Sequence, residues 1–153
     1  MVLVTVGTQK QQFRRLLQLV ENAKELDQEQ IVVQSGYTEF KSEKMQFIPF
    51  MKMEEFNAYI EKADMIITHG GVGSIFSALK AKKKILAVPR LHEFGEHVND
   101  HQLEICKELQ ALGYIFYLEK EDNIDDRIKE LRHANLKEYV SNLDFLDKLR
   151  KEI

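Results

Sequence analysis

The segment from residue 64 to residue 102 constrains the fold of this chain more than any other stretch. Residues 65–68 form a short apolar run, typical of a buried strand, and a histidine and two glycines follow at once. Apolar residues then recur at helical spacing over residues 72–79, and residues 85–88 are again apolar. This order predicts a strand, a glycine turn, a helix and a second strand. Glycines at such a turn let the backbone approach a ligand, and the first-turn N–H groups of the helix attract an anion.

The rest of the chain repeats this alternation of strand and helix. Apolar runs predict strands at residues 2–6, 31–34, 45–50, 65–68, 85–88 and 114–118, and helical spacing predicts helices at residues 13–20, 53–63, 72–79, 99–112, 121–131 and 136–149. Such alternation predicts an α/β fold, a doubly wound, Rossmann-like parallel sheet of about six strands in the order 3-2-1-4-5-6. Residues 1–153 are expected to form a single domain whose C-terminal helices occupy about residues 121–153.

In a sheet of this order, ligands bind beyond the carboxyl ends of the strands, where the order reverses between the first and the fourth strand. Residues 7–9, Gly-Thr-Gln, end the first strand, and residues 69–71, His-Gly-Gly, end the fourth. The two glycine turns are therefore expected to face each other across a crevice. Pattern and topology alone thus predict a binding site there.

Charge and cysteine content argue against several classes of function. The net charge is −3 with both signs interspersed, so no nucleic-acid partner is expected. Cys106 is the only cysteine, which suits a reducing cytosol. The sequence lacks a signal peptide and any apolar run near the ~20 residues that span a bilayer, so membrane association is expected only through the surface or a partner. A C-terminal apolar stripe either packs on its own domain or docks to a partner; it consists of Leu136, Tyr139, Val140, Leu143, Leu146 and Leu149.

The turn at residues 70–74 is the strongest candidate for a phosphate site. Its three glycines and the hydroxyl of Ser74 would cradle a diphosphate, and the alternative is a structural strand-to-helix turn without a ligand. The turn is not the dinucleotide fingerprint, which belongs after the first strand, nor a P-loop, because no Gly-Lys-Ser/Thr follows. His69 either packs in the interior or donates a hydrogen bond to phosphate or sugar oxygens.

Polar side chains crowd at residues 99–102, Asn-Asp-His-Gln, where a helix is expected to begin. A single N-cap needs only one of them, whereas several Asn, Asp and Gln side chains together suit the neighbouring hydroxyls of a sugar. Four of the five histidines lie between residues 69 and 101, which raises the question of a metal. The spacing of His92 and His97 is not that of zinc proteases, so no metal site is expected.

Several segments resemble the C-terminal, donor-binding half of the GT-B glycosyltransferases of family 28. They are residues 69–74 (His-Gly-Gly-Val-Gly-Ser), 88–90 (Val-Pro-Arg) and 95–102 (Gly-Glu-His-Val-Asn-Asp-His-Gln), and residues 4–9 (Val-Thr-Val-Gly-Thr-Gln) fit as well. The resemblance covers nearly the whole chain. It is closest to stand-alone donor-binding subunits of bipartite enzymes, above all the small subunits of bacterial capsule and exopolysaccharide transferases. The cytosolic subunit of the dolichol-pathway N-acetylglucosaminyltransferase is another.

The resemblance implies that a UDP-sugar binds here and that a separate, membrane-attached subunit binds the acceptor. Residues 70–74 would hold the diphosphate, Phe50 and Met51 the uracil, and residues 99–102 the donor sugar. The implied donor-binding residues are Gly7, Thr8, Phe50, Met51, His69, Gly70, Gly71, Gly73, Ser74, Arg90, Glu96, His97, Asn99, Asp100 and Gln102. Many relatives carry Glu three residues after the position of Ser74 to hold the ribose. This chain has Ser77 there, and Glu93 or Glu96 is expected to substitute.

These features predict the UDP-sugar donor-binding subunit of a two-component, inverting, metal-independent glycosyltransferase in bacterial capsule or exopolysaccharide synthesis. The chain is expected to be cytoplasmic and peripheral to the inner face of the membrane through its partner. Helix N–H groups, Ser74 and His69 or Arg90 would stabilise the leaving diphosphate. The general base would come from the partner, with His69 as another candidate, and no cofactor is expected. The alternative is a non-catalytic scaffold that stabilises or activates a membrane-bound transferase. An oxidoreductase is disfavoured, because no dinucleotide fingerprint follows Val6.

Overall fold

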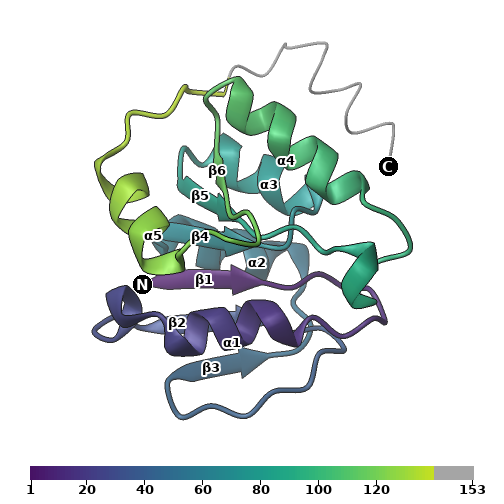
Figure 1. Ribbon diagram of the computed structural model, residues 1–153. Coiled ribbons are helices and arrows are strands. Elements are labelled where there is room, and N and C mark those ends of the chain that lie inside the picture. The colour runs from purple at the N-terminus through teal and green to yellow at the C-terminus, as the bar shows by residue number, and fades with distance from the viewer. Residues whose placement is uncertain (140–153) are drawn as a thin grey trace.

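The computed structural model describes residues 1–139, which form one parallel sheet with helices on both faces (Figure 1). The strand order is β3-β2-β1-β4-β5-β6, and every neighbouring pair is parallel. This order confirms the predicted doubly wound, Rossmann-like fold. The strands are β1 (Val2–Thr5), β2 (Ile31–Gln34), β3 (Met45–Ile48), β4 (Met65–Thr68), β5 (Lys84–Ala87) and β6 (Phe116–Tyr117). The α-helices are α1 (Arg14–Asn22), α2 (Met53–Lys62), α3 (Val72–Lys80), α4 (His101–Ala111) and α5 (Ile124–His133), with short 3-10 helices η1 (Lys24–Leu26) and η2 (His92–Phe94).

Alternate side chains of β1 pack on opposite faces of the sheet. Val2 and Val4 join a core cluster with α1 and α5, whereas Leu3 joins a second cluster with α2, α3 and α4. Every residue of β1, β2 and β4 is buried, as expected for parallel strands that are covered on both faces. Burial of one side chain such as Leu3 contributes about 2 kcal/mol, so apolar packing holds both helix layers to the sheet.

The observed bounds of β2 and β4 agree with those predicted from the sequence, and the bounds of the other strands differ. β2 and β4 have the predicted bounds, and β1 ends one residue early, at Thr5. β3 ends at Ile48 instead of residue 50, and β5 is shifted one residue toward the N-terminus. β6 keeps only Phe116–Tyr117 of the predicted residues 114–118. It lies at the sheet edge, where β5 alone supplies ladder hydrogen bonds.

Helix α1 begins one residue later than predicted, at Arg14, and α4 and α5 begin later because Asn side chains bond to their first turns. Oδ1 of Asn99 accepts a hydrogen bond from the N–H of His101 at 3.1 Å, so α4 begins at residue 101 instead of 99. Oδ1 of Asn123 accepts one from the N–H of Asp126 at 3.0 Å and caps α5, which begins at residue 124 instead of 121.

The predicted helix at residues 136–149 does not begin at residue 136. The chain after α5 has no helical structure as far as residue 139. The N–H of Lys137 donates to the carbonyl of Gly113 at 2.8 Å, and the ring of Tyr139 packs edge-on against Phe76 with centroids 5.7 Å apart. These contacts replace the helical hydrogen bonds of the predicted first turn. The remainder of the predicted helix and of its apolar stripe lies outside the described residues.

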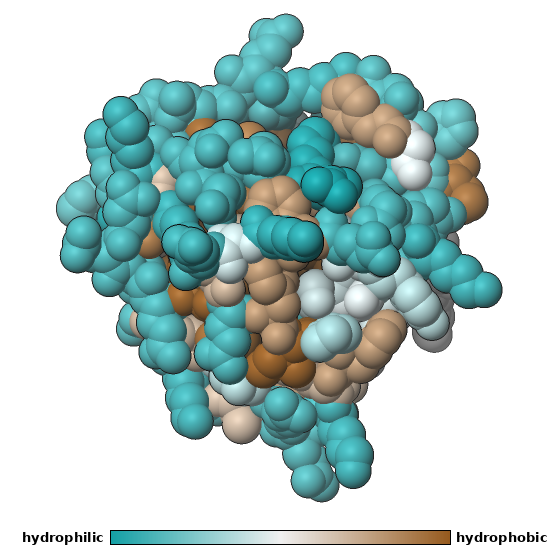
Figure 2. All heavy atoms as spheres, turned by 90° about the horizontal axis from the view of Figure 1, so that it is seen from below, coloured by the Kyte–Doolittle hydropathy of each residue, from teal (hydrophilic) through white to brown (hydrophobic). Residues whose placement is uncertain are grey.

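Hydrophobic side chains also reach the surface. Seen from below, toward β3, the surface is mostly hydrophilic, with hydrophobic side chains emerging in the middle of the face (Figure 2). The large apolar side chains that are exposed are Tyr37, Phe50, Met53, Phe94, Val98 and Leu112. No helix within residues 1–139 combines the length and the apolar character needed to cross a membrane.

Candidate functional site

The carboxyl ends of β1 and β4 bring the two glycine turns together. Thr5 and Thr68 are partners in the parallel ladder, and their hydroxyl oxygens lie 2.8 Å apart in a hydrogen bond. The residues that follow therefore leave the sheet at the same edge, and Gly7 does so with φ +85°, which favours glycine. Gly7 and Gly71 border one cleft. The predicted meeting of the two turns, at the point where the strand order reverses, is confirmed.

The cleft between the turns has a volume of about 390 Å³. One side is the first turn of α3, which has neither a side-chain cap nor an acidic residue. N–H groups in a first helical turn lack intrahelical partners and favour an anion. Aromatic and methionine side chains supply apolar surface, so the cleft combines an anion-binding end with a wall suited to a planar ring. It is lined by Gly7, Thr8, Gln9, Gln34, Phe50, Met51, Met53, Phe56, His69, Gly71, Gly73, Ser74 and Ser77.

The ring of His69 fills a slot between the two turns. A Cβ atom at Gly71 would lie 2.5 Å from Nε2 of His69, and one at Gly7 would lie 2.8 Å from Cε1, both closer than real Cβ atoms come. Gly70, with φ +81°, lets α4 approach, since a Cβ there would lie 3.1 Å from Sγ of Cys106. These glycines therefore make room for a histidine and a helix as well as for a ligand.

Burial sets the protonation state of the groups around this slot. Desolvation, and secondly the cation of Arg90, lower the pKa of His69 to about 3, so the ring is neutral near pH 7. Burial also lowers the pKa of His97 from its ordinary value. Burial raises the pKa of the Cys106 thiol to about 12, so it remains protonated and unreactive.

Arg90 is buried behind the cleft and does not line it. Its guanidinium donates to backbone carbonyls of Val6 at 2.6 Å, Gln11 at 2.8 Å and Glu96 at 2.8 Å. It also stacks over the ring of Phe13, 4.9 Å from the centroid. The structure therefore places Arg90 against the surrounding loops, and not among the residues that line the cleft.

Glu96 is likewise buried and does not line the cleft. Its carboxylate accepts hydrogen bonds from Nε of Arg15 at 3.0 Å, from Nη2 of Arg15 at 2.9 Å and from the N–H of Leu91 at 3.1 Å. Because Arg15 belongs to α1, this ion pair ties α1 to the loop after β5. Glu93 pairs with Lys120, and neither glutamate lines the cleft.

Gln102 also lies behind the cleft, where it joins two other elements. Its side chain is buried, and Oε1 accepts a hydrogen bond from the backbone N–H of Arg90 at 3.1 Å. Its Nε2 lies 3.4 Å from Nδ1 of His69. The structure therefore places Gln102 against the histidine of the glycine turn, and not among the residues that line the cleft.

The other predicted residues before α4 are occupied with local hydrogen bonds. Nδ1 of His97 accepts from the N–H of Asn99 at 3.3 Å, and Oδ1 of Asp100 accepts from the N–H of His92 at 2.9 Å. None of the three predicted side chains here, at residues 97, 99 and 100, lines the cleft. Within residues 1–139, no three His, Cys, Asp or Glu side chains converge in a way that could hold a metal ion.

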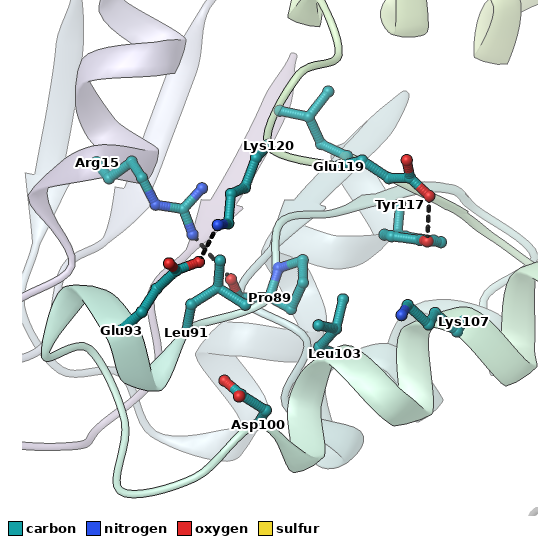
Figure 3. A pocket seen from close by; sticks show the side chains of 11 residues that line it. Arg15, Pro89, Leu91, Glu93, Asp100, Leu103, Lys107, Tyr117, Glu119 and Lys120 are labelled. Carbon is teal, nitrogen blue, oxygen red and sulfur yellow. Dashed lines mark hydrogen bonds and ion pairs between the residues drawn. The ribbon is translucent and has the colours of Figure 1, made fainter.

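Asp100 lines a second pocket instead, of about 460 Å³, at the ends of β5 and β6 (Figure 3). Figure 3 shows Lys120 paired with Glu93 across it, Tyr117 donating to Glu119 at 2.6 Å, and Lys107 of α4 at its side. The lining residues are Arg15, Pro89, Leu91, Glu93, Asp100, Leu103, Lys107, Tyr117, Leu118, Glu119 and Lys120. No glycine turn borders this pocket, so the cleft beside α3 remains the candidate phosphate site.

Sequence reasoning misses three residues of the cleft, which are Gln34, Met53 and Phe56. Gln9 belongs to the predicted turn at residues 7–9, and Ser77 lies at the position where the resemblance implies a ribose-binding residue. Gln34 ends β2, and its Nε2 donates to the carbonyls of Gly7 at 3.3 Å and Pro49 at 2.9 Å. Its position at the carboxyl end of the strand beside β1 is a signal that could have found it. Oε1 of Gln9 is buried without a hydrogen-bond partner among the described residues.

Comparison with known proteins identifies the family. Residues 1–151 match the glycosyltransferase family 28 C-terminal domain, and the chain belongs to this family. Similar proteins are named UDP-N-acetylglucosamine transferase subunit ALG13. The one from Candida albicans is 31% identical over 105 residues, which is 65% of this chain and 34% of that protein. The one from Debaryomyces hansenii is 27% identical over 137 residues, covering 83% of this chain and 63% of that protein. The chain thus spans about a third of the first and less than two thirds of the second.

Solved structures with the same fold are glycosyltransferases as well. The calicheamicin glycosyltransferase CalG4 superposes with a TM-score of 0.64 at 15% identity, over 98% of this chain and 37% of that one. The NMR solution structure of ALG13 superposes with a TM-score of 0.61 at 18% identity, over 97% of this chain and 93% of that one. The family and the fold are those of a glycosyltransferase, and the fold is that of one half of a GT-B enzyme.

Proposed function

We propose that this chain binds the UDP-sugar donor of a two-component glycosyltransferase. The observation that carries the proposal is the cleft of about 390 Å³ that both glycine turns border. In it, a diphosphate would accept hydrogen bonds from the first turn of α3 and from the hydroxyl of Ser74. Phe50 and Met51 would pack against the uracil ring. The name of the relatives, which describes subunits of a UDP-N-acetylglucosamine transferase, supports this class of donor.

In the proposed reaction this chain stabilises the leaving group. Negative charge grows on the diphosphate as the bond between sugar and phosphate breaks, and donors that already point at that position lower the barrier. Those donors are the N–H groups of α3, Ser74 and a neutral His69, so no metal ion or other cofactor is needed. Asn99 and Asp100 do not line the cleft, and they are proposed to meet the donor sugar where it extends beyond the cleft. The acceptor hydroxyl loses its proton to a base on the partner subunit.

We also propose the setting of this reaction. The chain is cytoplasmic, and a membrane-anchored, acceptor-binding subunit holds it at the inner face of a bacterial membrane. The product is a capsule or exopolysaccharide precursor, a proposal supported by the Val-Pro-Arg sequence at residues 88–90 and the segment 95–102. The match is to a C-terminal domain, and we propose that a separate subunit supplies the acceptor-binding half of the enzyme. Transfer is expected only when both subunits are present.

The test compares two substitutions, each of which adds one negative charge, by isothermal titration of UDP. A Cβ at Gly73 meets nothing within 4 Å, so Asp fits there without a clash. The comparison is Gln30→Glu, which adds the same charge at an exposed position. Only Gly73 lines the cleft. Gly73→Asp places a carboxylate where the diphosphate binds and should weaken UDP binding at least tenfold, about 1.4 kcal/mol, from a micromolar dissociation constant. Gln30→Glu, the control, lies outside the cleft and should bind UDP like the wild type. If neither the chain nor its complex with the partner binds UDP, the proposal is wrong.

One observation favours a second function, that of a non-catalytic scaffold for a membrane-bound transferase. No Asp or Glu lines the cleft, and Ser77 stands at the position where the resemblance implies a ribose-binding Glu. Transfer assays on the two-subunit complex separate the two functions. Gly73→Asp abolishes turnover if this chain binds the donor. It leaves turnover unchanged if the chain acts only as a scaffold.

A further inference from the structure

We infer that Gln102 is a positioning residue that holds His69 in the neutral tautomer protonated on Nε2. In this tautomer Nε2 donates a hydrogen bond to the diphosphate of the bound UDP-sugar. The identity of the ligand rests on the proposed function. The tautomer itself does not, since it follows from contacts within the chain.

The first step is the orientation of the Gln102 amide. Oε1 lies 3.1 Å from the backbone nitrogen of Arg90, in the interior. That backbone N–H can only donate, so the atom that faces it must be the amide oxygen. If the amide were flipped, its NH₂ group would face the backbone N–H of Arg90. Two donors would then oppose each other in the interior, which costs about 1–3 kcal/mol. The NH₂ group of Gln102 therefore faces His69.

The second step carries this constraint to the imidazole. Nε2 of Gln102 lies 3.4 Å from Nδ1 of His69, and an amide NH₂ has no lone pair to offer. Nδ1 must therefore be the acceptor. A neutral imidazole carries one proton, and burial keeps this ring neutral. The proton is consequently on Nε2.

The third step is where Nε2 lies. A Cβ placed at Gly71 would lie 2.1 Å from Cε1 and 2.5 Å from Nε2, and one placed at Gly7 would lie 2.8 Å from Cε1 and 3.0 Å from Nε2. The edge of the ring formed by Cε1 and Nε2 therefore abuts both glycine turns, with Nδ1 farther from each. His69 lines the cleft, and within the described residues nothing accepts a hydrogen bond from Nε2. A diphosphate held by α3 would supply the missing acceptor. We call this chain of contacts the relay. It runs from the backbone N–H of Arg90 after β5, through the amide of Gln102 on α4, to the ring of His69 after β4.

The substitution Gln102→Glu tests the relay because it changes the group that faces Nδ1 of His69 from a hydrogen-bond donor into an acceptor. A carboxylate still accepts from the N–H of Arg90, but it presents an acceptor to Nδ1 of His69. The neutral ring must then carry its proton on Nδ1 and turn a lone pair toward the cleft. At lower pH the ring of the variant takes up a second proton and regains the donor on Nε2. The charged and titratable groups that face the ring are Arg90 and His97, with the protonated thiol of Cys106 behind Gly70.

The first experiment is ¹⁵N NMR of the full-length protein, which distinguishes the protonated from the unprotonated ring nitrogen. His69→Asn assigns the signals. The wild type should show an unprotonated Nδ1 and a protonated Nε2 across pH 6–8. Gln102→Glu should show the reverse at pH 8, and Gln30→Glu, which adds the same charge at an exposed position, should resemble the wild type. A protonated Nδ1 or a mixture in the wild type overturns the inference. So does a Gln102→Glu protein that keeps the wild-type pattern.

The second experiment titrates UDP into the same proteins at pH 6 and pH 8. At pH 8, Gln102→Glu should bind UDP roughly tenfold or more weakly than Gln30→Glu, because a hydrogen bond to a charged group is lost. At pH 6 the difference between the two dissociation constants should be smaller. A mere packing defect would weaken binding equally at both pH values, and that result overturns the role of the tautomer in donor binding. If the wild type shows the expected tautomer but never binds UDP, the proposed function fails and the relay stands.

Discussion

Lowering the pH from 7 to 5 should destabilise this protein through one buried histidine. The pKa of His69 is about 3 in the folded chain against an ordinary 6.5. Below pH 6.5 the unfolded chain therefore binds a proton that the folded chain refuses, so stability is full above that value and falls as the pH drops toward 3. At pH 5 the unfolded histidine is protonated in about 97% of molecules. The resulting loss in the free energy of unfolding is about 2 kcal/mol.

Urea denaturation at both pH values measures this loss, with His69→Asn as the comparison. Oδ1 of Asn can accept the hydrogen bond from Gln102 near the position of Nδ1, and Asn does not titrate. The variant is less stable at pH 7 because it is smaller, but it should lose about 2 kcal/mol less than the wild type on going to pH 5. The contribution of His97 is common to both proteins and cancels. Equal losses in the two proteins would refute the assignment of a neutral, buried His69.

Three further substitutions test the packing around the cleft. Arg90→Met should lower the free energy of unfolding by about 3 kcal/mol in urea, because three backbone carbonyls lose their donors, whereas a residue that only contacted the donor would leave stability unchanged. Gly71→Ala should lower the melting temperature by several degrees in calorimetry, since its Cβ overlaps the ring of His69; wild-type melting would argue against the slot. Gly73→Ala, with open space around its Cβ, should instead stabilise α3 by about 0.5–1 kcal/mol, and a loss of stability would contradict that geometry.

The fold and the place of the cleft can be predicted from the sequence because their signals are local. β2 and β4 are short, wholly apolar or nearly so, and bounded by polar turns, which is how a strand buried on both faces reads. The rule that places ligands at the reversal of strand order then locates the cleft without any side-chain detail. Residues 7 and 71 meet there for this reason alone.

The roles of Arg90 and Glu96 could not be predicted, because their partners are remote in the chain. Arg90 bonds to the carbonyl of Val6, 84 residues away, and Glu96 pairs with Arg15, 81 residues away. A charged residue next to a glycine turn has the same local sequence whether it faces a ligand or the interior. Only the packed loops decide between the two. The same holds for Gln102, whose two partners lie on different elements.

The shared space of His69 and Gly71 has an evolutionary consequence. The effect of a substitution at either position depends on the residue at the other, because the imidazole of His69 occupies the space that a side chain at position 71 would fill. Alanine at position 71 is harmful beside an imidazole and tolerable beside serine at position 69. The two positions are therefore epistatic, and in descendants of this chain a change at the glycine should follow, and not precede, a shrinking of the histidine.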